Sequence, residues 1–323
     1  AALDRERKAS GRRHVDVVGA LLCALGLGGI MFGLIEGPGH GFAEPAIYLP
    51  LGCGALAFAG FLFYERAAKD PMVDLDLFRH RNFAVGNAAT LAIYAGLSGV
   101  MFLISVFLQQ VAGYSATASG LALMPVTAML FLLSPVAGRL AAKWGPRWFM
   151  AAGPATSAVG VALMTRLDAE GRYVPELLPG VLVFGLGLSL TVAPLTATVL
   201  GDVDERHAGV GSAVNNAVAR VAGLLAVAAV GALAAARFGA VLDREATDLS
   251  NHREIRAFLA EARERPLDAS VPERLGVEGK RLRPILTRAS VSSLHATLWA
   301  TVALLLVGSA ISAAGITNRP ERR

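Results

Sequence analysis

Charged residues, aromatic residues and cysteine are all scarce in this sequence. Only 17% of the 323 residues are charged and 7% are aromatic, whereas 54% are hydrophobic and the mean hydropathy is +0.53. Soluble domains carry about 25% charged residues, so the composition excludes an ordinary soluble globular protein. The apolar excess comes mainly from Ala, Leu, Val and Gly. Small residues of this kind favour close helix packing in lipid.

The two cysteines and six histidines form no pattern typical of a metal or cofactor site. Cys23 and Cys53 each lie inside an apolar run, and the histidines are scattered. We expect both cysteines to be small buried hydrophobes rather than a disulfide or a ligand pair. The sequence also lacks a G-x-x-x-x-G-K-[ST] loop, an H-E-x-x-H motif and a G-x-S-x-G elbow. We therefore expect no metal, no cofactor and no enzyme activity.

Eight apolar stretches are long enough, or nearly so, to cross a membrane. A hydrocarbon core of ~30 Å requires ~20 apolar helical residues, and only helices or closed barrels satisfy the backbone there. Alternation with a period of two is absent. The sequence therefore predicts an all-α polytopic membrane protein with eight transmembrane helices. The predicted spans are residues 17–35, 45–64, 83–108, 116–138, 148–165, 177–201, 208–236 and 289–318.

The basic residues predict the orientation of these spans. Loops and ends on the side of the two termini hold sixteen Lys and Arg, whereas the short loops on the other side hold two. The positive-inside rule then places both termini in the cytoplasm. The formal charge of +5 is explained by this topology, and we expect no nucleic-acid partner.

Segment 237–288 is a long charged piece between the last two spans, predicted to be a periplasmic loop. Ile255, Phe258, Leu259 and Ala262 recur at helical spacing within it. Two interpretations are open. One is a structural, solvated amphipathic cap, and the other is a substrate gate.

The span 208–236 carries the one charged residue within the predicted spans. Arg220 shares a helical stripe with Ser212 and Asn216, and Asn215 lies 100° to one side. A central Arg costs at least ~2.5 kcal/mol in lipid, so we expect Arg220 to be buried and paired. Either Arg220 and the two asparagines line a substrate path, or they satisfy backbone carbonyls at a packed helix seam.

A second polar stripe follows the span 83–108. Its members fall within ~60° of one another on a helical wheel, and the rest of that helix is apolar. Such a line suits a wet lumen, and interhelical hydrogen bonding is the alternative. The stripe consists of Asn87, Tyr94, Ser98, Ser105 and Gln109. Met124 in the next span is a further substrate-path candidate, because methionine suits a promiscuous apolar pocket, although core filling also explains it.

The loop GRLAAKWGPR (138–147) lies between two spans. Its skeleton resembles the cytoplasmic loop motif of the major facilitator superfamily, G-x-x-x-D-[RK]-x-G-x-[RK]. Gly138, Lys143, Gly145 and Arg147 match that motif, and Ala142 replaces the acid. The replacement is similar to the weaker copy in the second half of such transporters, so a charge relay through this loop is in doubt.

Three more stretches resemble one branch of that superfamily, the fourteen-helix drug:proton antiporters of the EmrB/QacA type. They are RRHVDVVGALLCALGLGGIMFGLIEG (12–37), DPMVDLDLFRHRNF (70–83) and PLTATVLGDVDERHAGVGSAVNNAVARVAG (194–223). The resemblance implies that residues 1–82 form two central linker helices with a cytoplasmic connector. It further implies that residues 83–323 form the C-terminal six-helix half of a major facilitator fold.

The function implied by the resemblance is proton-driven efflux of amphipathic drugs or other small toxic compounds by alternating access. The implied partners are an N-terminal six-helix half, membrane lipid, a small-molecule substrate and, as a further candidate, a periplasmic adaptor. No Asp or Glu lies within the predicted spans, so no proton-coupling residue is assigned here. The alternative is a membrane scaffold or assembly subunit that does not transport.

Overall fold

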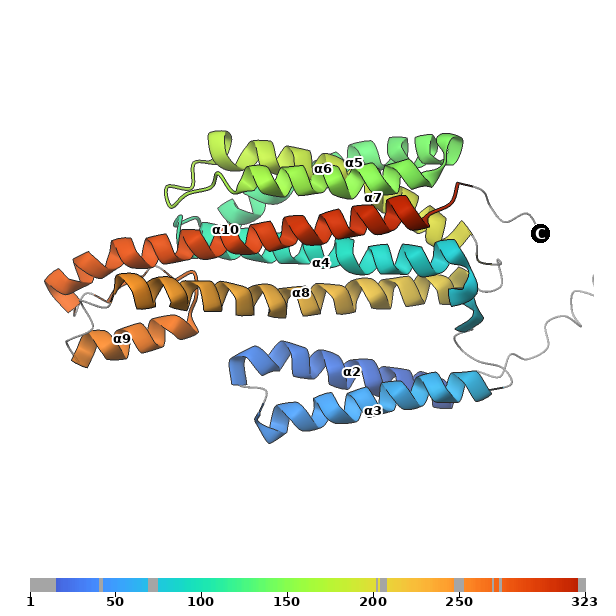
Figure 1. The fold of residues 1–323 in the computed structure, drawn as a ribbon, viewed down its shortest axis with the longest axis horizontal. Helices are drawn as coiled ribbons and strands as arrows, with labels where there is room; N and C mark the ends of the chain where they lie inside the picture. The colour runs from blue at the N-terminus through green and yellow to red at the C-terminus, as the bar shows by residue number, and fades with distance from the viewer. Residues whose placement is uncertain are drawn as a thin grey trace, which may run out of the picture. The chain divides into compact units, whose positions relative to one another are not determined.

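The computed structural model describes residues 16–40, 43–68, 75–201, 203, 208–246, 253–268, 270–272 and 275–318 (Figure 1). Every regular element in these ranges is helical, and none of them is a strand. The chain divides into two compact units, which we treat separately. Unit 1 comprises residues 1–79 with 205–210, and unit 2 comprises residues 80–204 with 211–323.

Unit 1 contains a hairpin of two long helices, α2 (Val17–His40) and α3 (Pro45–Ala67), followed by the 3₁₀ turn η1 (Leu75–Arg79). The two helices pack closely because small residues meet at their contact. A Cβ atom at Gly29 would lie 2.5 Å from the Pro50 carbonyl oxygen, and one at Gly54 would lie 2.7 Å from the Ile30 nitrogen. Only glycine allows the backbones to approach this far.

The centre of unit 2 is built from α4 (Arg81–Gln110), α5 (Ala116–Trp144), α6 (Pro146–Met164) and α7 (Leu178–Gly201), with a π-helical turn η2 (Tyr173–Leu177) before α7. Helix α7 packs against α5 and α6, and α6 packs in turn against α10. The α6–α7 contact is close: a Cβ atom at Gly160 would lie 2.4 Å from the Phe184 nitrogen. Phe107, Phe184 and Leu298 are fully buried in the resulting core.

Two very long helices complete unit 2, namely α8 (Ala208–Glu245) and α10 (Gly276–Gly315). At ~1.5 Å per residue they extend well beyond a ~30 Å hydrocarbon core. Helix α9 (Arg253–Glu264) packs on both of them where α8 ends and α10 begins (Figure 1). We call this end of unit 2 the α9 end, and the end that carries residues 138–147 the loop-motif end.

Segment 237–288 was predicted to be a long connection between the last two spans, and most of its described residues are helical. Helix α8 continues to Glu245, and α10 already begins at Gly276. The helical spacing within the segment is confirmed, since Ile255, Phe258 and Leu259 of α9 are buried with α8 and α10 residues in one apolar cluster. The predicted spans are shorter than these two helices because abundant charges were taken as the end of each helix. Helices α8 and α10 instead continue as amphipathic helices.

A helix occupies each of the eight predicted spans, and seven helical segments are long and apolar enough to cross a membrane. The prediction of eight spans stays a prediction, because α6 is not among these seven. Helices α2 and α3 also extend past their predicted bounds to include Glu36 and Glu65. The predicted spans themselves hold no acid, but α3 continues past its predicted bound and buries Glu65, which is only 3% exposed. The burial expected of both cysteines is wrong for Cys53, which is exposed.

Candidate functional site: the polar face of α4 and α8

A network of three side chains joins α4 to α8, and we call it the polar seam. The Asn215 amide donates to Asn87 Oδ1 at 3.1 Å and to Thr90 Oγ1 at 2.8 Å. Asn87 and Thr90 are themselves buried, and they donate to the carbonyl oxygens of Phe83 and Gly86 within their own helix. Each of the three side chains of the seam thus has a hydrogen-bond partner, which is what buried polar groups require. Two predicted residues, Asn87 and Asn215, are brought together, and Thr90 was missed.

Farther along α4 the two helices come close again at Ser98. A Cβ atom at Gly223 of α8 would lie 2.7 Å from Ser98 Oγ, so α8 passes directly over this hydroxyl. At the next residue, Gly99, an added Cβ atom would lie 3.3 Å from the Val230 side chain of α8. Ser98, which was predicted to line a wet path, therefore lies at a helix–helix contact.

The α9-end portion of the α4 stripe contacts α5 instead of α8. Gln109 donates its amide to the Ser105 carbonyl and hydroxyl oxygens, each at 3.1 Å, and Ser105 Oγ lies 3.4 Å from Ser119 Oγ. Tyr94 is half-buried between these two groups of contacts, and its hydroxyl has no partner among the described residues. The stripe is thus divided between two neighbouring helices rather than forming one continuous polar line.

Arg220 and Asn216 lie on an open face of α8. Both are exposed, and the Asn216 amide donates only to the Ser212 carbonyl of its own helix at 3.1 Å. No described residue forms an ion pair or hydrogen bond with the Arg220 guanidinium. The expectation that Arg220 is buried and paired is therefore wrong for the described chain. The energetic reasoning remains: a charge at this depth needs protein, water or a ligand beside it.

Met124 lies on the exposed side of α5, where 61% of the residue is accessible. Thr127 is also exposed, and Phe131, two turns beyond Met124, is 81% exposed. Core filling within the described chain is therefore excluded for Met124. An apolar and aromatic surface of this kind contrasts with the polar, charged face of α8.

The four motif residues lie together at the loop-motif end. Gly138, Lys143 and Gly145 line a cleft of about 430 Å³. Gly145 ends α5 with φ +90°, and a Cβ atom there would lie 2.4 Å from the Asn318 side chain. Arg147 donates its backbone N–H to Asn318 Oδ1 at 3.1 Å and its Nε to the Ala313 carbonyl at 2.8 Å. The motif therefore closes the α5–α6 turn onto the end of α10.

Arg81 is a residue of this end that sequence reasoning did not assign to it. Its Nε and Nη2 donate to the carbonyl oxygens of Gly315 and Ala314 at 2.8 and 3.1 Å. Together with Arg147 it satisfies the last carbonyls of α10, where the helix dipole favours cations. Asn82 adds a third contact, because its Oδ1 accepts from the Thr317 backbone at 2.9 Å. The Arg-Asn pair at the start of α4 was the available signal.

The site as a whole combines a fixed part and an open part. The polar seam fixes α8 to α4, whereas Asn216 and Arg220 on α8, and separately Met124 on α5, remain exposed. Within the described residues no cluster of three or more His, Cys, Asp or Glu side chains could hold a metal ion. The exposed side chains of the open part, Asn216, Arg220 and Met124, offer an amide, a cation and an apolar surface for binding.

Known sequences place this arrangement in a family. The sequence profile described as Major Facilitator Superfamily matches residues 15–227. The multidrug resistance protein Stp of Mycobacterium tuberculosis is 29% identical over 231 residues, which are 72% of this chain and 43% of that protein. A probable actinorhodin transporter of Streptomyces coelicolor is 33% identical over 236 residues, which are 71% of this chain and 40% of that protein. The puromycin resistance protein of Streptomyces alboniger is 30% identical over 232 residues, 70% of this chain and 45% of that protein. The chain thus spans less than half the length of these relatives.

Proposed function

The chain belongs to the major facilitator superfamily, a family of membrane transporters rather than enzymes, and from this premise we propose that it forms part of a proton-driven efflux permease. The permease exports amphipathic drugs or other small toxic compounds by alternating access, in which two halves rock about a site near the membrane midplane. The three relatives are named for multidrug resistance, actinorhodin transport and puromycin resistance. These names support export as the activity.

One observation carries the proposal within this chain: the open face of α8. The predicted spans hold no other charged residue, yet Arg220 is exposed on α8, one turn from the exposed Asn216. Exposed apolar residues need only lipid, but an exposed Arg at this depth costs at least ~2.5 kcal/mol if it faces lipid. We propose that this face lines the translocation path opposite a second half of the permease.

The proposed complete protein is of the fourteen-helix EmrB/QacA type. In it, α2 and α3 are the two central linker helices, and α4 to α8 with α10 form the C-terminal six-helix half. The implied partners are an N-terminal six-helix half, lipid, a small-molecule substrate and a periplasmic adaptor as a further candidate. The distribution of Lys and Arg supports cytoplasmic termini in a bacterial inner membrane, and the α9 end is then periplasmic.

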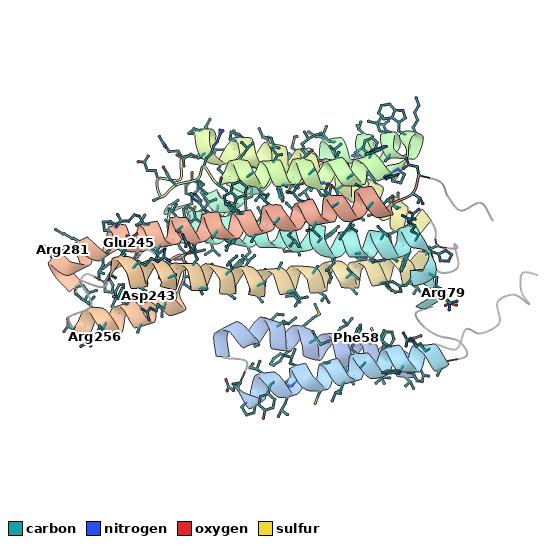
Figure 2. All side chains as sticks on the ribbon, in the orientation of Figure 1. Phe58, Arg79, Asp243, Glu245, Arg256 and Arg281 are labelled. Carbon is teal, nitrogen blue, oxygen red and sulfur yellow. The ribbon has the colours of Figure 1, made fainter. Side chains whose placement is uncertain are left out.

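Ion pairs favour a structural role for the α9 end over a gate. Arg288 of α10 bonds to Glu245 of α8 at 2.7 Å, and Arg263 of α9 pairs with Asp243 of α8. Figure 2 shows Asp243 and Glu245 near the end of α8, beside α9. The three helices share these pairs and one apolar cluster, so we propose that the α9 end moves as one body.

The test of this function is a resistance and efflux panel with the full-length gene, in cells that lack their own pumps. We expect export that stops when a protonophore collapses the proton gradient and that persists when only the sodium gradient is dissipated. Vesicles containing residues 1–323 alone should not transport, because the proposed pathway is formed between two halves. Full-length protein that inserts at normal abundance but exports none of the panel would support a scaffold instead, and efflux by residues 1–323 alone would contradict the two-half arrangement.

A further inference from the structure

A groove of about 980 Å³ opens at the α9 end of unit 2, away from the polar face of α4 and α8 described above. Residues 237–245 of α8, residues 287–299 of α10 and the turn at residues 168–170 line it. His295 fixes the turn to α10, because its Nε2 lies 2.9 Å from the Leu167 carbonyl oxygen. The groove is thus bounded by three elements that are held together.

The groove changes from charged to apolar along α10. Arg288 lies toward the α9 end, and Trp299 lies eleven residues, or about 16 Å, nearer the membrane-spanning part. Trp299 is 56% exposed, and tryptophan is typical of the boundary between headgroups and hydrocarbon. Val241 and Val291 form an apolar wall of the groove between its charged part and Trp299. A phospholipid has the same order of polarity along its length.

Two arginines on the α8 wall have no described carboxylate within salt-bridge distance. Arg237 and Arg244 are seven residues apart, so they share one face of α8 about 10 Å apart. Arg237 uses its Nε to donate to Ser292 Oγ at 3.0 Å, which leaves the terminal guanidinium nitrogens for another acceptor. The third arginine of the groove, Arg288, is already neutralised by Glu245 at 2.7 Å. Guanidinium groups of this kind match phosphate geometry.

The opposite rim carries an excess of carboxylates. Asp168 and Glu170 line the groove. Both pair with the Arg172 guanidinium, at 3.8 and 3.4 Å, and Glu176 pairs with the same guanidinium at 2.6 Å. The hydrogen bond to Glu176 raises the pKa of Arg172 above its ordinary value, so this guanidinium stays charged. One cation thus faces three acids, and the groove presents positive charge on α8 and negative charge on the turn.

We propose that this groove binds the headgroup of an aminophospholipid from the membrane. Its phosphate binds Arg237 and Arg244, its primary ammonium faces Asp168 and Glu170, and its chains pass Trp299. A phosphatidylglycerol headgroup has no cation for the acidic rim. A phosphatidylcholine headgroup has a quaternary ammonium that cannot donate hydrogen bonds to it. The groove therefore selects phosphatidylethanolamine by charge and by donors.

The test uses the full-length protein in phosphatidylcholine nanodiscs doped with phospholipids whose acyl chains are brominated and quench tryptophan. The difference between the wild type and Trp299→Phe isolates the Trp299 signal. At equal mole fraction, brominated phosphatidylethanolamine should quench Trp299 more than brominated phosphatidylcholine or phosphatidylglycerol. The pair Arg237→Gln and Arg244→Gln should remove that excess, whereas Arg265→Gln, directly after α9 and outside the groove, should preserve it.

The acidic rim gives the second set of variants. Asp168→Asn with Glu170→Gln should lower quenching by phosphatidylethanolamine to the phosphatidylcholine level. Equal quenching by all three lipids in the wild type overturns the proposal without any variant, so a misfolded mutant cannot hide a failure. Stronger quenching by phosphatidylglycerol overturns the ammonium contact. Relief of quenching by inorganic phosphate identifies a soluble phosphate site and overturns the lipid assignment.

Discussion

Arg220→Ala and Arg220→Lys, each made in the full-length permease, are expected to abolish most transport while the protein still inserts in the membrane. Hydrogen bonds to charged groups contribute about 1.5–3 kcal/mol, and about 1.4 kcal/mol corresponds to a tenfold effect. Transport should therefore fall by roughly tenfold or more. Lysine should not rescue it, because a planar fork of five donors becomes a single point charge.

The measurement for Arg220 is the initial efflux rate divided by the amount of protein in the membrane. Arg256→Ala on α9 is the matched control, since Arg256 is exposed at the α9 end, away from the spans (Figure 2). Arg172 would be a poor control, because it neutralises Glu176, whose side chain is 6% exposed. Normal efflux by Arg220→Ala would remove Arg220 from the path. A loss that follows abundance alone would assign it to structure.

Asn215→Leu is expected to weaken the fold of unit 2, whereas Asn216→Leu is expected to spare it. The Asn215 amide donates two hydrogen bonds to α4, at 3.1 and 2.8 Å. Without it, Asn87 Oδ1 and Thr90 Oγ1 are buried acceptors that have lost their donor. Each such group costs about 1–3 kcal/mol, although interhelical bonds in membranes average only ~0.6 kcal/mol. A net loss of about 1–2 kcal/mol is expected.

Thermal unfolding of the purified full-length variants in detergent measures this difference. The double variant Thr90→Val with Asn215→Leu should lose less than the sum of the single variants, because they share one bond. Asn216→Leu should melt like the wild type yet transport more slowly, since its amide bonds only within α8. Equal melting of Asn215→Leu and the wild type would show that the polar seam does not hold the helices together.

The apolar periodicity of the sequence was sufficient to locate the helices, but it could not locate where the two longest ones end. Each predicted span contains a helix because lipid leaves the backbone few alternatives. Beyond the membrane, a charged helix can continue only if another element covers its apolar stripe. Helix α9 supplies that cover through Phe258 and Leu259, and such a tertiary contact is not visible in local composition.

The candidate site was predictable in its membership more than in its geometry. Asn215 and Asn216 are adjacent in sequence and 100° apart on the helix, so one turns to α4 and the other remains exposed. Periodicity alone could not decide which of the two asparagines faces α4, because that depends on the rotation of α8 about its axis. Thr90 was missed since threonine in an apolar span more often bonds its own helix, as its hydroxyl also does here.

Accessibility of position 216 is the most direct measurement of the central claim, that the open face of α8 lines an alternating path. A single cysteine is introduced as Asn216→Cys in a full-length background without other cysteines, and Val307→Cys, on an exposed part of α10, is the control. We predict that a membrane-impermeant maleimide labels position 216 much faster than position 307. We also predict that substrate slows this labelling, and that reversing the proton gradient changes the side from which it occurs. Labelling of position 216 that is as slow as that of position 307, and indifferent to substrate and gradient, would contradict the claim.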